Sequence, residues 1–113
     1  MTVAEIMRLL PLTVLTTQEN LEREITGGFA SDLLSNVMGQ ARPGQVWVTM
    51  QGHQNIVAVA SLIGLAAVII AGGAQVDEAV VTKANNADVI LLTTPLPTFD
   101  VVGQLYSQGI RGS

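Results

Sequence analysis

The side chains best suited to chemistry or ligand binding lie in one polar segment between two apolar stretches. Thr49, Gln51, His53 and Asn55 all carry hydrogen-bonding groups, and His53 is the only histidine of the chain. A histidine side chain can transfer protons or bind an anion at neutral pH. The same residues could instead serve the fold alone, with His53 and Asn55 tying down the loop at the start of a helix. Both interpretations are open at this point.

Catalysis would require partners for His53. Asp32 and His53 could form a dyad with Ser31 or Ser35, but nothing in the spacing of these residues requires that arrangement. The sequence has neither a P-loop nor a Gly-x-Gly-x-x-Gly dinucleotide fingerprint. A single histidine without cysteines cannot form a usual zinc site. We therefore expect no enzyme activity, no metal and no cofactor, and an enzyme that uses His53 is only the third hypothesis.

Glycine and threonine positions extend the candidate ligand site beyond this segment. They are Thr26, Gly27, Gly28, Gly72, Gly73 and Thr93. Paired glycines permit positive φ and a close approach of the backbone. For the pair at 27–28, that freedom would serve a tight turn, an anion-binding nest or packing against a partner subunit. The three alternatives are open.

Composition limits the class of protein. The chain has 113 residues, 49% of them hydrophobic and 12% charged, which suits one folded domain with a substantial core. The formal net charge of −4 argues against a nucleic-acid-binding protein, because such a protein needs a basic surface. There are no cysteines for disulfides, and residues 1–10 do not resemble a signal peptide, so we expect a cytoplasmic protein. Residues 1–110 are expected to form the domain, and residues 111–113 to be a remnant of cloning.

Residues 43–76 contain no Asp, Glu, Lys or Arg, which raises the question of a membrane span. Within them, residues 56–73 have Ser61 as their only polar side chain, and a transmembrane helix needs roughly 20 apolar residues. Gly64 divides this run into an Ala/Val-rich part and a shorter part typical of a buried strand. No aromatic or basic residues flank the run as interfacial anchors. We therefore expect no membrane span.

Hydrophobic periodicity, together with glycine and proline positions, predicts the secondary structure. A Thr-x-x-Glu capping box at Thr2 begins a short helix. Strands are expected over residues 12–15, 21–26, 46–50, 67–71 and 88–93, and further helices over residues 31–41, 53–63, 77–87 and 97–108. The second of these strands alternates apolar and charged residues, as an exposed or edge strand would. In the last helix the inward-facing residues are expected to be Phe99, Val102, Leu105 and Tyr106.

From residue 46 onward, strands and helices alternate, which indicates a parallel sheet with helices on both faces. In such a sheet, ligands bind beyond the carboxyl ends of the strands, where loops and helix N-termini meet. The loops expected there are residues 49–55, 72–73 and 93–98. The sequence therefore places the main part of the candidate ligand site at that edge of the sheet.

Two segments resemble the DRTGG domain family. Residues 22–35, EREITGGFASDLLS, resemble the signature region of that family, and residues 47–60, WVTMQGHQNIVAVA, resemble its Thr-x-Gln-x-His-x-Asn segment. Glu24 and Ile25 stand where the family has Asp and Arg, whereas the Thr-Gly-Gly that follows is kept. The resemblance covers essentially the whole chain.

The resemblance implies a three-layer α/β/α sandwich with a mostly parallel sheet, similar to the N-terminal domain of HPr kinase/phosphorylase. Domains of this family also accompany phosphotransacetylase catalytic domains and occur within CBS-containing pyrophosphatases. In those proteins the other domains carry out the chemistry, so the resemblance implies an accessory role. The positions carried over from the family, without an assigned role, are Thr26, Gly27, Gly28, Gln51, His53 and Asn55.

Two hypotheses lead the functional interpretation. The first is a regulatory or interaction module without catalysis, homodimeric and able to bind a partner enzyme. Its motivation is the family's accessory role and the exposed strand expected over residues 21–26. The second is a small-molecule sensor that binds a nucleotide or phosphorylated metabolite at residues 49–55 and 72–73. Neither hypothesis involves a nucleic acid or a membrane.

Overall fold

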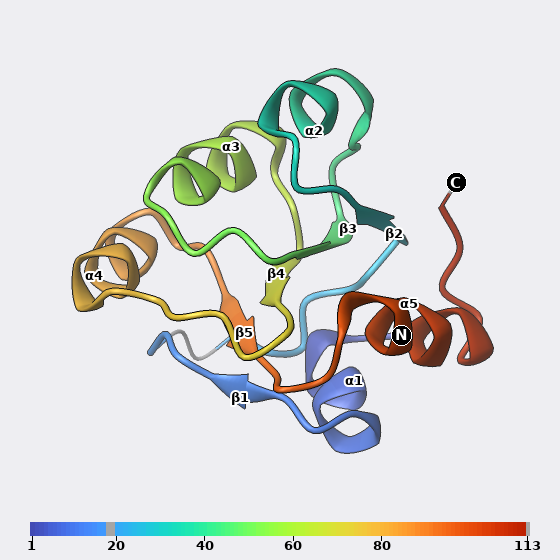
Figure 1. The fold of residues 1–113 in the computed structure, drawn as a ribbon. Helices are drawn as coiled ribbons and strands as arrows, with labels where there is room; N and C mark the ends of the chain where they lie inside the picture. The colour runs from blue at the N-terminus through green and yellow to red at the C-terminus, as the bar shows by residue number, and fades with distance from the viewer. Residues whose placement is uncertain (18–19, 113) are drawn as a thin grey trace.

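The computed structural model describes residues 1–17 and 20–112, and its centre is a single sheet of five strands (Figure 1). The strands are β1 (Thr13–Val14), β2 (Gly27–Ala30), β3 (Gln45–Thr49), β4 (Ala67–Ile70) and β5 (Leu91–Thr93). Their order across the sheet is β1-β5-β4-β3-β2. Strands β2 to β5 pair in parallel, and β1 pairs with β5 in the antiparallel sense.

Helices cover both faces of the sheet. They are α1 (Val3–Leu9), α2 (Leu34–Gln40), α3 (Asn55–Ile63), α4 (Glu78–Asn86) and α5 (Thr98–Ser107). Helices α2, α3 and α4 lie on one face, and α1 and α5 lie on the other (Figure 1). This arrangement confirms the expected α/β/α sandwich with a mostly parallel sheet. Within the described ranges, no helix is long and apolar enough to cross a membrane.

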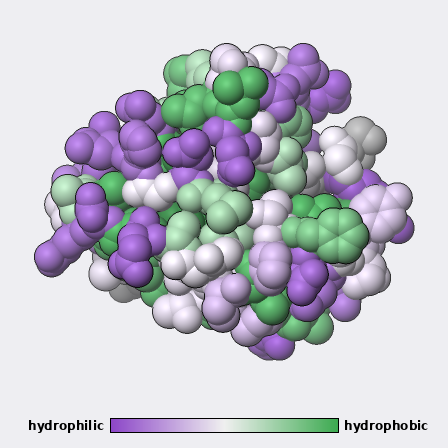
Figure 2. Space-filling view, in the orientation of Figure 1, coloured by the Kyte–Doolittle hydropathy of each residue, from purple (hydrophilic) through white to green (hydrophobic). Residues whose placement is uncertain are grey.

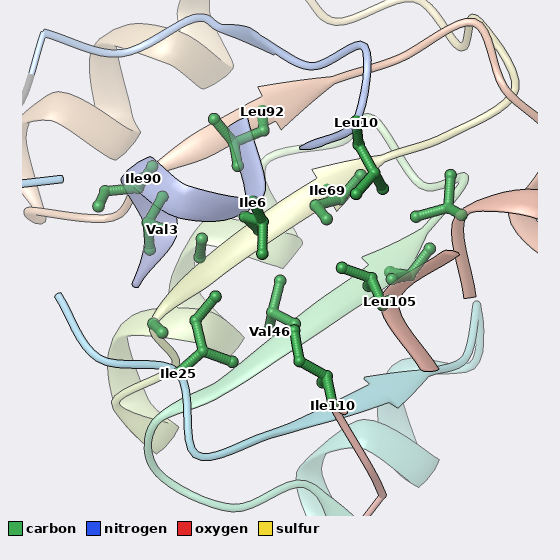
Figure 3. Packing of buried hydrophobic residues seen from close by; sticks show 14 of the residues in the cluster. Val3, Ile6, Leu10, Ile25, Val46, Ile69, Ile90, Leu92, Leu105 and Ile110 are labelled. Carbon is green, nitrogen blue, oxygen red and sulfur yellow. The ribbon is translucent and has the colours of Figure 1, made fainter. Parts of the chain in front are cut away.

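Alternation along the strands divides the core into two clusters. In β3, Val46 and Val48 belong to the cluster under α1 and α5, whereas Trp47 belongs to the cluster under α2, α3 and α4. All three side chains are buried. Figure 3 shows the first cluster, where side chains from α1 and α5 meet those of the strands. Because helices cover both faces, the central strands are apolar throughout, and this burial explains the uncharged run in the sequence.

The N-terminal helix begins as its sequence predicts. Glu5 N–H donates to Thr2 Oγ1 at 3.2 Å, and Thr2 N–H donates to Glu5 Oε1 at 3.1 Å, which completes the capping box. The other elements lie within three residues of their expected bounds, apart from the segment that precedes β2.

The segment at residues 21–26 is not the strand that its alternation predicts. Its backbone binds the start of α1 instead, because the carbonyl groups of Leu21 and Arg23 accept hydrogen bonds from N–H groups in the first turn of that helix. Glu24 makes one isolated bridge, with Thr2. The strand that follows this segment, β2, lies at one edge of the sheet and contains the two glycines that the sequence suggests as a break. The prediction of an exposed strand over residues 21–26 is therefore wrong. One of the two reasons for expecting a homodimer is removed with it.

Helix α5 faces the sheet with a different stripe from the expected one. Val101 and Leu105 are buried, whereas Phe99 is 87% exposed, Tyr106 56% and Val102 37%. The expectation holds for Leu105 and is wrong for the other three residues. Both stripes have helical spacing, and the contacts of α5 with β2 and β3 select one of them. The stripe that faces outward is apolar and contains two aromatic side chains.

The last described residues contact the edge of the sheet. The carbonyl group of Arg111 accepts a hydrogen bond from Gly28 N–H at 2.8 Å, and that of Gly112 accepts one from Gln45 Nε2 at 3.3 Å. Residue 113 lies outside the described ranges. These contacts join the tail to β2 and β3. The expected domain boundary before Arg111 stays a prediction.

Removal of residues 111–113 is expected to lower the free energy of unfolding by about 1 kcal/mol. The truncation leaves Gly28 N–H without its acceptor, and one such hydrogen bond contributes on the order of 0.5–1.5 kcal/mol. Urea unfolding followed by circular dichroism measures the difference. Arg111→Ala keeps the backbone acceptor and is the control, with a smaller expected loss. Equal stability of the truncated and full chains would show that the tail contact contributes nothing.

Candidate functional site

The loop that follows β3 is fixed by Asp32. Its Oδ1 atom accepts hydrogen bonds from Thr49 Oγ1 at 2.8 Å and from Met50 N–H at 2.7 Å. Thr49 Oγ1 in turn accepts one from Gln51 N–H at 3.1 Å, and Gln51 Nε2 donates to the carbonyl group of Asp32 at 3.2 Å. Thr49 is fully buried. Two residues of the candidate ligand site, Thr49 and Gln51, are thus engaged in holding the loop.

A buried tryptophan positions the segment that carries Asp32. Trp47 lies in β3 with its side chain fully buried, and its Nε1 atom donates to the carbonyl group of Ser31 at 2.9 Å. Ser31 N–H donates to the carbonyl group of Val48 at 3.2 Å. These two bonds fasten the connection between β2 and α2 to the neighbouring strand. The Asp32 carboxylate consequently lies beside the end of β3.

Beyond this loop, helices α3 and α4 begin at a shared cleft of about 440 Å³. Its lining residues are Gly52, His53, Gln54, Gln75, Asp77, Ala79 and Val80. Gln54 is the N-cap of α3 and Asp77 is the N-cap of α4, so both helix N-termini open onto the cleft. His53 lies at the cleft with its side chain exposed, and Asn55 follows as the exposed first residue of α3.

The start of α4 offers free hydrogen-bond donors. Asp77 is its N-cap, as the sequence predicts, but the Asp77 side chain makes no capping hydrogen bond. The N–H groups of Val80 and Val81 donate to the Asp77 carbonyl oxygen. Those of Glu78 and Ala79 have no acceptor within the described part of the chain. The cleft therefore combines the partial positive charge of a helix start with the carboxylate of Asp77.

Gly52 lets the loops after β3 and β4 meet. A Cβ atom at this position would lie 2.2 Å from the carbonyl oxygen of Gln75. Gly52 is not among the described residues with positive φ, so lack of space, rather than backbone conformation, requires glycine here. A Cβ atom on Gly72 would likewise lie 3.0 Å from Met50 Cε. The two loops are packed closely at both points.

The glycines at 72–73 join two loops and are not free to bind an anion through their N–H groups. Gly72 and Gly73 have φ angles of +72° and +66°. Their N–H groups donate to the carbonyl oxygens of Leu96 at 2.8 Å and Thr94 at 3.0 Å. Thr93, at the end of β5, lines a separate hollow of about 360 Å³ together with Gly73. The structure thus places these three candidate residues at the carboxyl edge but outside the cleft that His53 lines.

The Thr-Gly-Gly motif lies at the opposite edge of the sheet. Gly27 begins β2 and pairs with Gln45, the first residue of β3, so Thr26, Gly27 and Gly28 lie far along the strands from the carboxyl edge. Neither glycine has a positive φ. A Cβ atom on Gly27 would lie 2.8 Å from the carbonyl oxygen of Arg111. Here the glycines permit a close approach, and the segment that approaches is the chain's own tail.

The described residues do not assemble a catalytic dyad around His53. Asp32 is bound to the loop after β3, and Ser31 Oγ accepts a hydrogen bond from Asn36 Nδ2 at 3.1 Å, so neither side chain is paired with the imidazole. No cluster of three or more histidine, aspartate or glutamate side chains in these ranges could hold a metal ion. The arrangement offers hydrogen-bonding groups to a ligand but no activated nucleophile.

Two polar residues of the cleft, Gln75 and Asp77, lie outside the candidate residues and loops that the sequence suggests. A signal for them exists in the chain. Helices that follow neighbouring parallel strands begin at the same edge of the sheet, and β3 and β4 are neighbours. The residues just before α3 and α4 could therefore have been predicted to lie near one another at one site. Their spacing alone does not show which side chains turn toward one another.

Comparison with known proteins agrees with this fold. The model of the DRTGG domain matches residues 5–107. Among solved structures, the CBS and DRTGG domains of the regulatory region of Clostridium perfringens pyrophosphatase, complexed with the activator diadenosine tetraphosphate, are similar, with a TM-score of 0.77 and 13% sequence identity. The similarity covers 92% of this chain and 45% of that chain, so this chain spans less than half of it. No curated protein matches the chain.

Proposed function

The chain belongs to the DRTGG domain family, and we propose that it is a regulatory module that binds a small molecule and catalyses no reaction of its own. The observation that carries this proposal is the cleft onto which α3 and α4 both begin, with free backbone N–H groups at the start of α4 and no activated nucleophile. The pyrophosphatase region of similar fold is regulatory and was solved with a nucleotide activator, which supports a role of this kind.

The ligand that suits the cleft carries both an anionic group and hydroxyl groups. Free N–H groups at the start of α4, together with His53 and the Gln54 amide, would bind a phosphate. The Asp77 carboxylate would accept hydrogen bonds from ribose hydroxyls. A volume of about 440 Å³ lies within the usual range for small-molecule sites. We therefore propose a nucleotide or phosphorylated metabolite as the ligand class.

The module would act as a homodimer in the cytoplasm and change the activity of a partner enzyme according to its ligand. The regulatory place of the DRTGG domain in the pyrophosphatase supports a partner enzyme. The similarity to the N-terminal domain of HPr kinase/phosphorylase, and any role of the Thr26 motif in ligand binding, stay predictions.

Thermal unfolding with AMP, ATP, diadenosine tetraphosphate and inorganic phosphate tests the ligand proposal. At a concentration of about 100 times its dissociation constant, a ligand that binds the folded chain stabilises it by roughly 2.7 kcal/mol. His53→Ala removes one hydrogen bond to a charged group, worth about 1.5–3 kcal/mol, and is expected to weaken binding at least tenfold. Gln104→Ala changes an exposed polar residue of α5 and is the matched control, with unchanged affinity.

Two results would count against this proposal. No stabilisation by any of the four compounds would remove the nucleotide and phosphate class. Equal stabilisation of the His53→Ala and wild-type chains would place the binding site outside the cleft.

A further inference from the structure

The outer face of α5 is an apolar surface that the described part of the chain leaves uncovered. Phe99, Val102 and Tyr106 lie on it at helical spacing, and their exposed fractions are 87%, 37% and 56%. Gly103 lies between them, and no atom of residues 1–17 or 20–112 would come within 4 Å of a Cβ atom there. Figure 2 shows hydrophobic side chains over part of this helix, with hydrophilic ones beside them. Single exposed apolar residues are common on protein surfaces, whereas three on one face of a helix form a continuous apolar patch.

A groove beside this stripe is large enough for one aromatic ring. It has a volume of about 130 Å³ and opens between α5 and β2. Its walls include Phe29, Ala30 and Val48 from the sheet, and Leu105 and Tyr106 from α5. An apolar cavity of about 150 Å³ accommodates benzene. The chain thus exposes an aromatic ring, Phe99, at one end of α5 and an apolar groove near the other end.

We propose that these two features bind each other between two copies of the chain, with the α5 helices antiparallel. Phe99 and Tyr106 are equally distant from the midpoint between Val102 and Gly103. A two-fold rotation about that midpoint therefore places Phe99 opposite the partner's Tyr106, where the groove lies. Each copy gives a ring and receives one, as an isologous interface requires. This inference rests on the proposed homodimer and identifies its surface.

The exposed area supports a second copy as the occupant. Aromatic side chains bury about 150–250 Å² each, so the three exposed residues leave on the order of 300 Å² uncovered. Two-fold symmetry doubles this to about 600 Å², and the apolar walls of the two grooves add to it, toward the roughly 1,000 Å² that a specific interface buries. Gly103 weakens the helix relative to alanine, and no close contact with another described residue requires a glycine there. At the centre of a helix pair, it would permit the close approach that the two rings need.

Sedimentation velocity on the full chain at micromolar concentration tests the surface. We expect a wild-type dimer, and Phe99→Ser should raise its dissociation constant at least about tenfold. Because Phe99 is 87% exposed, this substitution leaves the fold intact, which circular dichroism checks. Leu62→Ser changes a 73% exposed leucine on α3 and is the matched control, with unchanged association.

A cross-link tests the antiparallel arrangement. The chain has no cysteine, so Gly103→Cys gives one thiol near the two-fold axis, and mild oxidation should yield a disulfide-linked dimer. Leu62→Cys should not cross-link. A monomeric wild type would overturn both the surface and the proposed homodimer. A dimer that persists in Phe99→Ser and fails to cross-link at position 103 would overturn the surface alone.

Discussion

Replacement of Asp32 by alanine is expected to lower the free energy of unfolding by about 2–3 kcal/mol and to abolish ligand binding at the cleft. The substitution leaves the Thr49 hydroxyl, which is fully buried, and Met50 N–H without their shared acceptor. A hydrogen bond to a charged group contributes about 1.5–3 kcal/mol. The expected loss in the free energy of unfolding is smaller than the sum of two such bonds, because Asp32 is exposed to solvent, which screens its charge.

The loss of binding follows from the position of the loop. Residues 50–54 connect the end of β3 to the start of α3, and Asp32 fixes the first part of that connection. Once released, the loop no longer holds His53 and Gln54 at the cleft. A rigid loop is what allows a small site to bind without an ordering cost.

Asp32→Asn separates the hydrogen bonds from the charge. Asparagine keeps an Oδ1 acceptor for both donors, so most of the stability and of the ligand affinity should return. Urea unfolding and nucleotide titration of the two variants measure both quantities. A wild-type unfolding curve for Asp32→Ala would show that the network does not hold the loop.

Gly52→Ala is the second substitution with a large expected effect. Its Cβ atom would lie 2.2 Å from the carbonyl oxygen of Gln75, and that atom belongs to the backbone, so one of the two loops must move. Overpacking of this kind costs about 1–3 kcal/mol. Because Gly52 and Gln75 both line the cleft, the movement also changes its shape. We expect lower stability and at least tenfold weaker nucleotide binding.

Gly39→Ala is the matched control for that substitution. Gly39 lies in α2, and no atom of the described residues would come within 4 Å of its added Cβ. Alanine in a helix is more favourable than glycine by roughly 0.5–1 kcal/mol, so this variant should gain stability and keep its ligand affinity. Thermal unfolding of both variants makes the comparison. Equal stability of Gly52→Ala and wild type would mean that the loops are not packed as described.

The alternation from residue 46 onward was sufficient to predict the central fold. Strands buried on both faces are continuously apolar, and the helices between them show periodicity and breaks at glycine or proline. The alternation predicts that β3, β4 and β5 are parallel, whereas their order across the sheet comes from the structure. The uncharged run over residues 46–73 could be assigned to strand, helix and strand because Gly64 divides it; this glycine has a φ of +81° and ends α3.

The two wrong predictions about the fold concern residues 21–26 and the buried face of α5. In both, the sequence pattern is compatible with more than one packing arrangement. Residues 21–26 alternate because Leu21 and Ile25 pack on the core while Glu22 and Glu24 face outward, but the backbone of this segment pairs with α1. In α5, two stripes with helical spacing compete, and only the position of the sheet decides between Leu105 and Phe99. Local spacing carries no information about that position.

The sequence predicts at which edge of the sheet the candidate ligand site lies, but not which residues line it. Parallel strands bring the loops after β3, β4 and β5 to one edge, as expected, yet the Thr26 motif starts a strand and therefore lies at the other edge. The roles of individual residues depend on hydrogen bonds across long sequence separations. Asp32, in the connection between β2 and α2, accepts hydrogen bonds from Thr49 and Met50 in the loop after β3, and Gly72 N–H donates to the Leu96 carbonyl group. No spacing rule contains these pairings.

Amide chemical shifts recorded with and without nucleotide test the central claim most directly. In ¹H–¹⁵N correlation spectra of the full chain titrated with ATP, and separately with diadenosine tetraphosphate, the account predicts saturable shifts concentrated at residues 52–55 and 75–80. These residues line the cleft or begin the two helices that open onto it. Shifts concentrated on α5 and β2, or no saturable shifts with either nucleotide, would contradict a nucleotide site at the cleft.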